Sequence, residues 1–264
     1  MSFSFASYCF DKYKKFLTHN YKDYSFNIDL KFGKVYFTRK LFTLPGKYLP
    51  FDLSLKYIEP HTTSTQTLHQ KTGLPIGVKT NYHLFLEYNT TYEQYWLEDA
   101  DGFLHVFKLA DNSTTLYFDK KGSGLMMEIL TGGGYKVFDD YGNYQLFDSN
   151  GRLTLIHQQI ANSHTAELTI TYISTDPVDS LRIYSITDNY GKVVYFSYTS
   201  SGVQISYNNN VVATISYDND MCLTEITKNI GDNHIITETF NCDPLLHEIA
   251  LDDGNLNWWW LQSL

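Results

Sequence analysis

The stretch LRIYSITDNYGKVVYFSY, residues 181–198, decides the fold class of this chain. Ile, Val, Tyr and Phe dominate its two halves, and these residues suit the pleated, half-buried surface of a β-strand. Between the halves stands Asp188-Asn189-Tyr190-Gly191, and Asp, Asn and Gly are residues that favour turns. The stretch therefore predicts a β-hairpin, with Gly191 as a structural residue of its turn.

The second half of the chain repeats this unit. Similar units start at Gly151, Leu181, Cys222 and Leu246, and the last of them has Gly254 as its turn glycine. Each unit has an apolar run containing Ile, and most continue with Asp or Asn near Gly and a strand ending in Tyr. A hairpin of roughly 20 residues cannot bury its apolar face alone, so several must stack. We therefore expect an all-β fold, an antiparallel β-hairpin repeat array that forms an open twisted sheet or a partial shell.

Turn signals also divide the middle of the chain into short apolar runs. Examples are Asp101-Gly102, Tyr141-Gly142-Asn143 and Asn150-Gly151. Asp-Gly and Asn-Gly suit tight hairpins in which both central residues have positive φ. The spacing of these signals predicts an antiparallel meander.

The N-terminal part contains the one plausible helix, a short helical segment over residues 3–24. Phe10, Tyr13, Phe16 and Leu17 stand there at helical spacing. The period then changes, and residues 26–57 alternate polar and apolar side chains as strands do.

A Leu44-Pro45-Gly46 turn interrupts these strands, with Pro45 and Gly46 as structural turn residues. Residues 59–79 are polar and contain Pro and Gly, which indicates a loop. We expect one continuous domain in three stretches: a helical or irregular segment at 1–25, a β region at 26–150 and hairpin repeats at 151–264.

Composition excludes several classes of function. The chain has 264 residues and a formal net charge of -9, without the basic stripe that nucleic-acid binding needs. Its three cysteines are too few and too widely spaced for a disulfide framework or a zinc site. We expect no transmembrane segment and no signal peptide. The localisation is therefore unknown, either cytoplasmic or outside the cell after export by a non-classical route.

No familiar catalytic motif is present. A phosphate-binding loop, a nucleophile elbow and an HExxH sequence are all missing. His61, His69 and His83 are spaced irregularly, so they indicate ordinary histidines and not a metal site. The acidic run from Asp139 to Asn143 indicates a hairpin turn in preference to a calcium loop. We predict no catalytic residue, cofactor or metal; a hydrolase with an unrecognised carboxylate pair stays as an alternative.

Tryptophans are the strongest candidates for contact with a ligand or partner. Trp258, Trp259 and Trp260 are consecutive, so in a strand the middle one faces away from the other two. They can cap the last repeat or pack on another polypeptide, stack on sugar rings, or insert at a membrane interface. Trp96 is a further candidate in the middle of the chain. A carbohydrate-binding module that uses exposed Tyr and Trp is therefore a second hypothesis.

Two sets of residues resemble a known family. Tyr217-Asp218 before Leu223-Thr224-Glu225-Ile226, and residues 186–192 before Phe196-Ser197-Tyr198, resemble the YD repeats of RHS proteins. Leu44-Pro45-Gly46 followed by Leu49-Pro50 is similar to the region that leads into the repeats of those proteins. The resemblance covers residues 26–257.

The resemblance implies a structural role. Relatives wind their hairpins into a large β shell that encloses a C-terminal toxin or effector, or present them on cell surfaces. It therefore implies a non-enzymatic, encapsulating module, with other RHS/YD-repeat segments, a second copy or a toxin cargo as partners. This chain departs from the pattern in having only about four repeats. The small number of repeats favours an open piece of a shell. Asp243-Pro244 is only faintly similar to the autoproteolysis motif of the family, and we interpret Pro244 as the start of a strand.

Overall fold

A computed structural model gives the structure of the chain. It describes residues 16–21, 24–29, 34–47, 50–58, 71–100, 103–161, 164–177, 180–229, 235–242, 246–252 and 260–262. Of these, residues 16–37, 58, 161 and those after 240 are described by their backbone alone.

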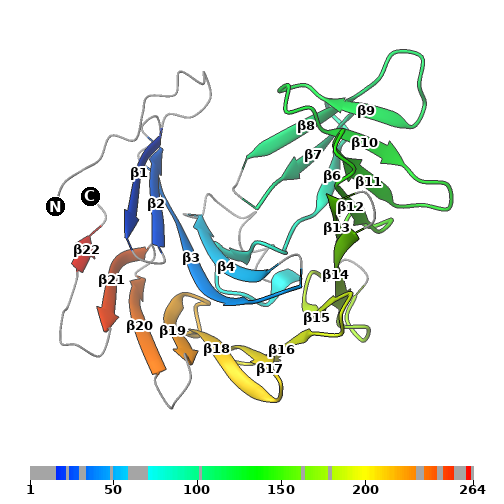
Figure 1. Ribbon diagram of the computed structural model, residues 1–264. Coiled ribbons are helices and arrows are strands. Elements are labelled where there is room, and N and C mark those ends of the chain that lie inside the picture. Colours follow the sequence, from blue (N-terminus) through cyan, green and yellow to red (C-terminus); the bar gives the residue numbers. More distant parts are fainter. Residues whose placement is uncertain are drawn as a thin grey trace. The chain divides into compact units, whose positions relative to one another are not determined.

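The described part of the chain is all-β (Figure 1). It contains 22 strands, and every strand pair whose register is described is antiparallel. This confirms the prediction of an all-β, antiparallel fold. Within the described residues, helical conformation is limited to residues 71–72, and no helix there could cross a membrane.

The strands are numbered in chain order. They are β1 (Phe16–Tyr21), β2 (Tyr24–Asp29), β3 (Lys34–Leu44), β4 (Phe51–Ile58), β5 (Val78–Thr80), β6 (Leu86–Asn89), β7 (Gln94–Glu98), β8 (Leu104–Leu109), β9 (Leu116–Asp119), β10 (Met126–Ile129), β11 (Tyr135–Phe138), β12 (Tyr144–Phe147), β13 (Leu153–Ala161), β14 (His164–Tyr172), β15 (Ile183–Asp188), β16 (Val193–Thr199), β17 (Gly202–Tyr207), β18 (Asn210–Tyr217), β19 (Leu223–Asn229), β20 (Ile235–Cys242), β21 (Leu246–Asp252) and β22 (Trp260–Gln262).

The chain divides into two compact units. Unit 1 consists of residues 1–42, 52–80 and 196–264, and unit 2 consists of residues 43–51 and 81–195. Each unit therefore combines an N-terminal segment with hairpins from later in the chain.

Unit 1 contains a sheet with the order β1-β2-β3-β4-β5 and the meander from β17 to β22. Leu41, Leu53, Leu55 and Ile215 are among its fully buried side chains. A buried ion pair joins β3 to β20 in this core. Arg39 donates from Nε to Oε2 of Glu238 at 3.0 Å and from Nη2 to Oε1, and both side chains are only 4% exposed.

One local prediction fails in unit 1, and a second holds for only part of its range. The end of the predicted helix, Phe16–Tyr21, is the strand β1, paired with β2 from Phe16↔Asp29 to Tyr21↔Tyr24. A short aromatic run satisfies helical and strand spacing alike, and here strand pairing decides. Residues 1–15 lie outside the described residues. The predicted loop at 59–79 is described only from residue 71; Leu74 is buried at a bend, and the last two residues belong to β5, where Val78 is buried.

Unit 2 is a meander in which each strand from β6 to β16 pairs with the next (Figure 1). Side chains alternate between its two faces. One face, here called the inner face, carries buried side chains such as Leu97, Phe107, Met127 and Val137. The opposite, outer face carries half-exposed and exposed residues such as Phe118.

The meander meets its own beginning at a seam, formed by residues 84–86 and 151–153. Leu86 N donates to Gly151 O at 2.7 Å, and Leu153 N donates to Leu84 O at 3.2 Å. Gly151 is required at this contact because a Cβ there would lie 2.1 Å from the Leu86 carbonyl oxygen. The seam joins segments more than 60 residues apart in the sequence, and no local pattern predicts it.

Candidate functional site

One turn recurs at the ends of several hairpins and begins with an aspartate. The Oδ1 atom of that aspartate accepts hydrogen bonds from the backbone N–H groups two and four residues later. Asp139 accepts from the N–H groups of Tyr141 and Asn143 at 2.8 and 3.0 Å, and Asp148 accepts from those of Asn150 and Arg152 at 2.9 and 3.0 Å. Asp188 accepts from the N–H groups of Tyr190 and Lys192 at 2.9 and 2.8 Å, and Asp218 accepts from those of Asp220 and Cys222 at 3.0 and 2.9 Å. We call this arrangement the clamped turn.

The fourth residue of each clamped turn has positive φ. Gly142, Gly151 and Gly191 have φ of 90°, 79° and 87°, and Met221 takes the same place with φ of 63°. The expectation of tight hairpins with two central residues at positive φ is therefore wrong here, because Asn150 and Tyr190 have ordinary φ. That tight turn occurs instead at Asn208-Asn209, between β17 and β18, with φ of 50° and 61°.

Two earlier aspartates use variants of this turn. Asp99 Oδ1 accepts from Phe103 N at 2.7 Å, four residues later. Asp119 Oδ1 accepts from Lys121 N at 3.1 Å and from Val106 N at 3.2 Å, and its Oδ2 accepts from the Ser123 hydroxyl at 2.5 Å. Both aspartates also reach the same histidine.

His105 is held between these two carboxylates. Its Nδ1 lies 3.0 Å from Asp119 Oδ2, and its Nε2 lies 3.3 Å from Asp99 Oδ2. A neutral imidazole donates from one nitrogen only, so two carboxylate partners suit the protonated ring. The side chains of His105 and Asp119 are 8% and 0% exposed.

The pKa shifts of this cluster follow from its contacts. Burial lowers the pKa of His105, but hydrogen bonds and charge attraction from Asp99 and Asp119 outweigh burial and raise the pKa above its ordinary value. Burial raises the pKa of Asp119, but the hydrogen bonds from His105, Ser123 and two backbone N–H groups lower it overall. Both shifts favour the charged pair.

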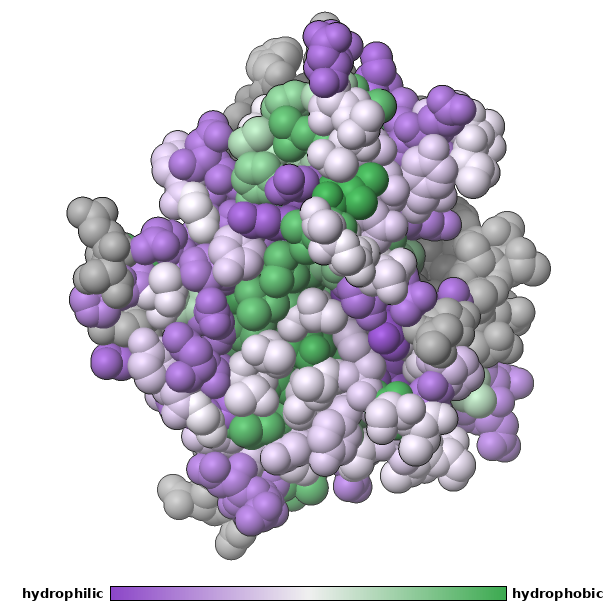
Figure 2. Space-filling model, turned by 90° about the vertical axis from the view of Figure 1, so that its right-hand side faces the viewer, coloured by the Kyte–Doolittle hydropathy of each residue, from purple (hydrophilic) through white to green (hydrophobic). Residues whose placement is uncertain are grey.

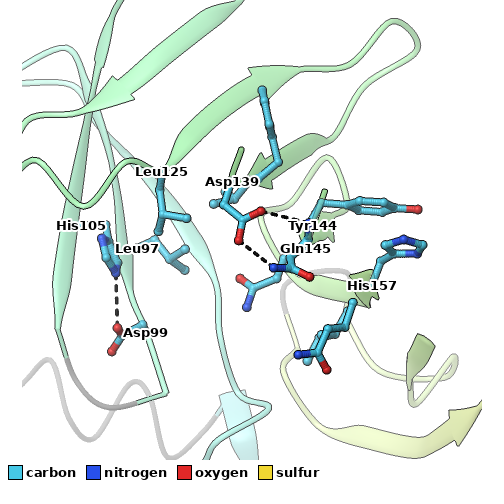
Figure 3. A pocket seen from close by; sticks show the side chains of 13 residues that line it. Leu97, Asp99, His105, Leu125, Asp139, Tyr144, Gln145 and His157 are labelled. Atoms are coloured by element: carbon cyan, nitrogen blue, oxygen red, sulfur yellow. Dashed lines mark hydrogen bonds and ion pairs between the residues drawn. The ribbon is translucent and has the colours of Figure 1, made fainter. Parts of the chain in front are cut away.

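A pocket of about 440 Å³ lies beside this cluster, entirely within unit 2 (Figure 3). Leu97, Asp99, His105 and Leu125 form one side of it, and residues of β11, β12 and β13 with the turns beside them form the other. On that second side, Asp139 Oδ2 accepts from the Asn143 amide at 2.8 Å.

An aromatic stack stands at the edge of the pocket. The rings of Tyr144 and His157 are 4.2 Å apart and nearly parallel, at 10°. Lys136 Nζ lies 4.6 Å from the Tyr144 ring centroid, and His157 Nδ1 lies 2.8 Å from Glu167 Oε1. The Tyr144 ring face is therefore occupied by its own neighbours, which leaves little of it for stacking on a sugar.

The sequence-predicted contact residues are scattered. Trp96 stacks on Tyr92 at 6.0 Å between ring centroids, and its buried Nε1 has no hydrogen-bond partner in the described part of the chain. Trp258, Trp259 and Gly254 lie outside the described residues. Trp260 begins β22, and its side chain is not described.

Two of the predicted turn regions come together in unit 2. The Pro45 carbonyl accepts from Lys192 Nζ, and Lys47 Nζ lies 5.2 Å from the Tyr190 ring. The turn with Pro45 and Gly46 therefore packs on the clamped turn that contains Gly191.

Sequence reasoning missed the cluster around His105, although a signal was available. Asp99, Asp119 and Asp139 stand 20 residues apart, each three residues before a glycine. That spacing marks equivalent positions in successive hairpins. Across the described residues no group of three or more His, Cys, Asp or Glu could hold a metal ion; His83 is buried, and His61 and His69 lie outside that part.

The comparisons with known proteins place the chain in no family. No protein-family model matches the sequence, and no curated protein matches it.

Proposed function

We propose that this chain is a non-enzymatic structural module, a piece of β-hairpin wall of the kind that RHS/YD-repeat proteins build around a cargo. The observation that carries the proposal is the clamped turn, which recurs with the same two backbone hydrogen bonds at Asp139, Asp148, Asp188 and Asp218. Repeated local geometry is what an array of stacked, equivalent hairpins needs.

The use of the carboxylates supports this proposal. A catalytic carboxylate faces a substrate, whereas Oδ1 of each clamped-turn aspartate is saturated by backbone N–H groups of its own turn. The turn packing of Pro45 against Lys192 supports it further, because it fixes the segment leading into the repeats onto a repeat. These contacts stabilise the wall itself.

Exposed apolar side chains support association with further protein. Phe118, Tyr184 and Ile235 are 47%, 51% and 64% exposed. Figure 2 shows apolar side chains reaching the surface among polar ones on one face of the molecule. Apolar side chains that gather in a contiguous exposed patch are typical of contacts with other polypeptides. We expect the partner to be another repeat-containing segment, a second copy or a cargo.

Sedimentation velocity of the full chain over a wide concentration range tests the proposal. We expect reversible self-association, weakened by Phe118→Ser because that change removes an exposed ring from the outer face. Tyr141→Ser is the matched control, since Tyr141 is 83% exposed at a turn tip. A strictly monomeric chain at the highest concentration, with no binding to added repeat-containing protein, would contradict the proposal.

A further inference from the structure

A glutamine interrupts the apolar inner face of unit 2. The strand registers place Met127, Val137, Gln145, Ile156 and Leu168 opposite one another in five successive strands. Met127, Val137 and Leu168 are buried, and Gln145 is half-buried between them. A polar side chain in such a row needs hydrogen-bond partners to offset its desolvation.

Neither Gln145 nor its neighbour Gln158 finds such a partner among the residues that the structure describes. Gln158 follows Ile156 by two residues in β13, so it shares the inner face. Both glutamines line the pocket, and the side-chain amide of neither hydrogen bonds to any described residue. In Figure 3, Gln145 extends from its strand toward the side that carries Leu97 and His105. Two amides are thus available to a molecule in the pocket.

The remaining lining combines apolar and acceptor groups. Leu97, Leu125, Val137 and Ile156 supply apolar surface. Asp139 adds carboxylate oxygens, and its carboxylate offers about four lone-pair sites, more than the three described hydrogen bonds occupy. A volume of about 440 Å³ lies within the range of small-molecule sites, about 300–1,000 Å³.

Charge narrows the class of ligand. Among the described residues that line the pocket none is Lys or Arg, and the charged His105 is already paired with Asp99 and Asp119, which disfavours an anion. Asp99 already faces His105, and Asp139 accepts from Tyr141 N, Asn143 N and the Asn143 amide, which reduces their attraction for a cation. The groups with unused donors are neutral amides, and hydroxyl groups match them because they both donate and accept.

We propose that this pocket binds a neutral sugar, with its hydroxyls on Gln145, Gln158 and Asp139, and its C–H face on the apolar side chains. This goes beyond the structural role and is independent of it. It also differs from sugar stacking on exposed aromatic residues, because the amides carry the recognition.

The test uses the full chain and a panel of neutral mono- and disaccharides, including glucose, galactose, mannose and N-acetylglucosamine. Saturation-transfer NMR detects binding, and calorimetry measures Kd. We expect saturable binding of at least one sugar, weakened about tenfold by Gln145→Leu and by Gln158→Leu, because each removes hydrogen bonds to the ligand. Gln204→Leu is the matched control: Gln204 is exposed in β17 of unit 1, and this change should leave Kd unaltered.

Urea unfolding of each variant confirms that it is folded before binding is measured. No saturable binding from the whole panel would overturn the proposal, and so would an unchanged Kd in both glutamine variants. Saturable binding of an alkylammonium ion in place of the sugars would overturn it in favour of a cation site. For a sugar that binds, the Kd of its methyl glycoside is measured as well. Loss of binding in the glycoside indicates a site for a free monosaccharide, and retained binding indicates a site for the end of a glycan chain.

Discussion

Replacing Gly151 with alanine tests whether the seam holds unit 2 together. The added Cβ would lie 2.1 Å from Leu86 O, far inside contact distance, and the oxygen that it meets belongs to the backbone. The clash can be relieved only if residues 84–86 move away from residues 151–153. That movement breaks the hydrogen bonds from Leu86 N to Gly151 O and from Leu153 N to Leu84 O.

Gly191→Ala separates this effect from backbone strain. Gly191 has φ of 87°, close to the 79° of Gly151, but a Cβ there meets nothing within 4 Å. A left-handed L-residue costs about 1–2 kcal/mol, offset by about 0.4–1 kcal/mol from the lower entropy of the unfolded chain. We therefore expect Gly191→Ala to reduce the free energy of unfolding by about 1 kcal/mol. Gly151→Ala adds the loss of two backbone hydrogen bonds, about 1–3 kcal/mol, for a total of about 2–4 kcal/mol.

Urea unfolding followed by far-ultraviolet circular dichroism measures both variants. The midpoint should fall further for Gly151→Ala than for Gly191→Ala, with a similar slope in each. Equal losses of stability in the two variants would refute the reasoning, because the seam would then contribute nothing beyond the strain of positive φ.

Three further predictions concern the clamped turn, the histidine cluster and the buried ion pair. Asp188→Ala removes two hydrogen bonds from backbone N–H groups, so it should lower the free energy of unfolding in urea by about 1–3 kcal/mol. The control is Asp140→Ala, because Asp140 is an exposed turn residue without such bonds. This control should change the free energy of unfolding little. The folded pKa of His105 lies above 6.5, so the stability that its charge contributes is complete below the unfolded pKa and is lost as pH rises through the folded pKa. Urea unfolding measured across that pH range should show this loss of stability in the native chain and not in His105→Gln. Identical pH profiles of the two proteins would contradict the prediction. Glu238→Gln removes the carboxylate charge that faces the buried Arg39, and it should lower the free energy of unfolding by about 3–5 kcal/mol in thermal or urea unfolding. The double variant Arg39→Met with Glu238→Leu should recover much of that loss. A Glu238→Gln variant as stable as the native chain would count against a contribution of the ion pair.

Local sequence predicted the hairpins well where strand pattern and turn residues agree. Residues 181–198 form β15 and β16 as expected, paired from Ser185↔Tyr195 to Thr187↔Val193. The turn type was predicted wrongly at Asn150-Gly151, because the decisive residue is Asp148, two positions before the dipeptide that suggested a tight turn. The helix ending at residue 24 was predicted wrongly in its last part, since Phe16–Tyr21 has a strand partner that helical spacing does not take into account.

The candidate pocket was beyond local reasoning. Asp99, His105 and Asp119 are separated by 6 and 14 residues, and only the registers of β7, β8 and β9 bring their side chains together. Gln145 looks like any polar strand residue in the sequence. Its significance depends on Val137 and Ile156 lying opposite it on the inner face.

The sequence by itself determined that this chain is built of antiparallel β-hairpins, because alternation along a strand and Asp, Asn and Gly at turns act over a few residues. Only the tertiary structure decided which hairpins share a unit, where residues 84–86 meet residues 151–153, and which polar groups face a common pocket. The physical reason is that these features depend on strand register and on contacts between distant segments. A shift of one residue in the register of β12 with β11 and β13 would move Gln145 to the outer face and remove its amide from the pocket.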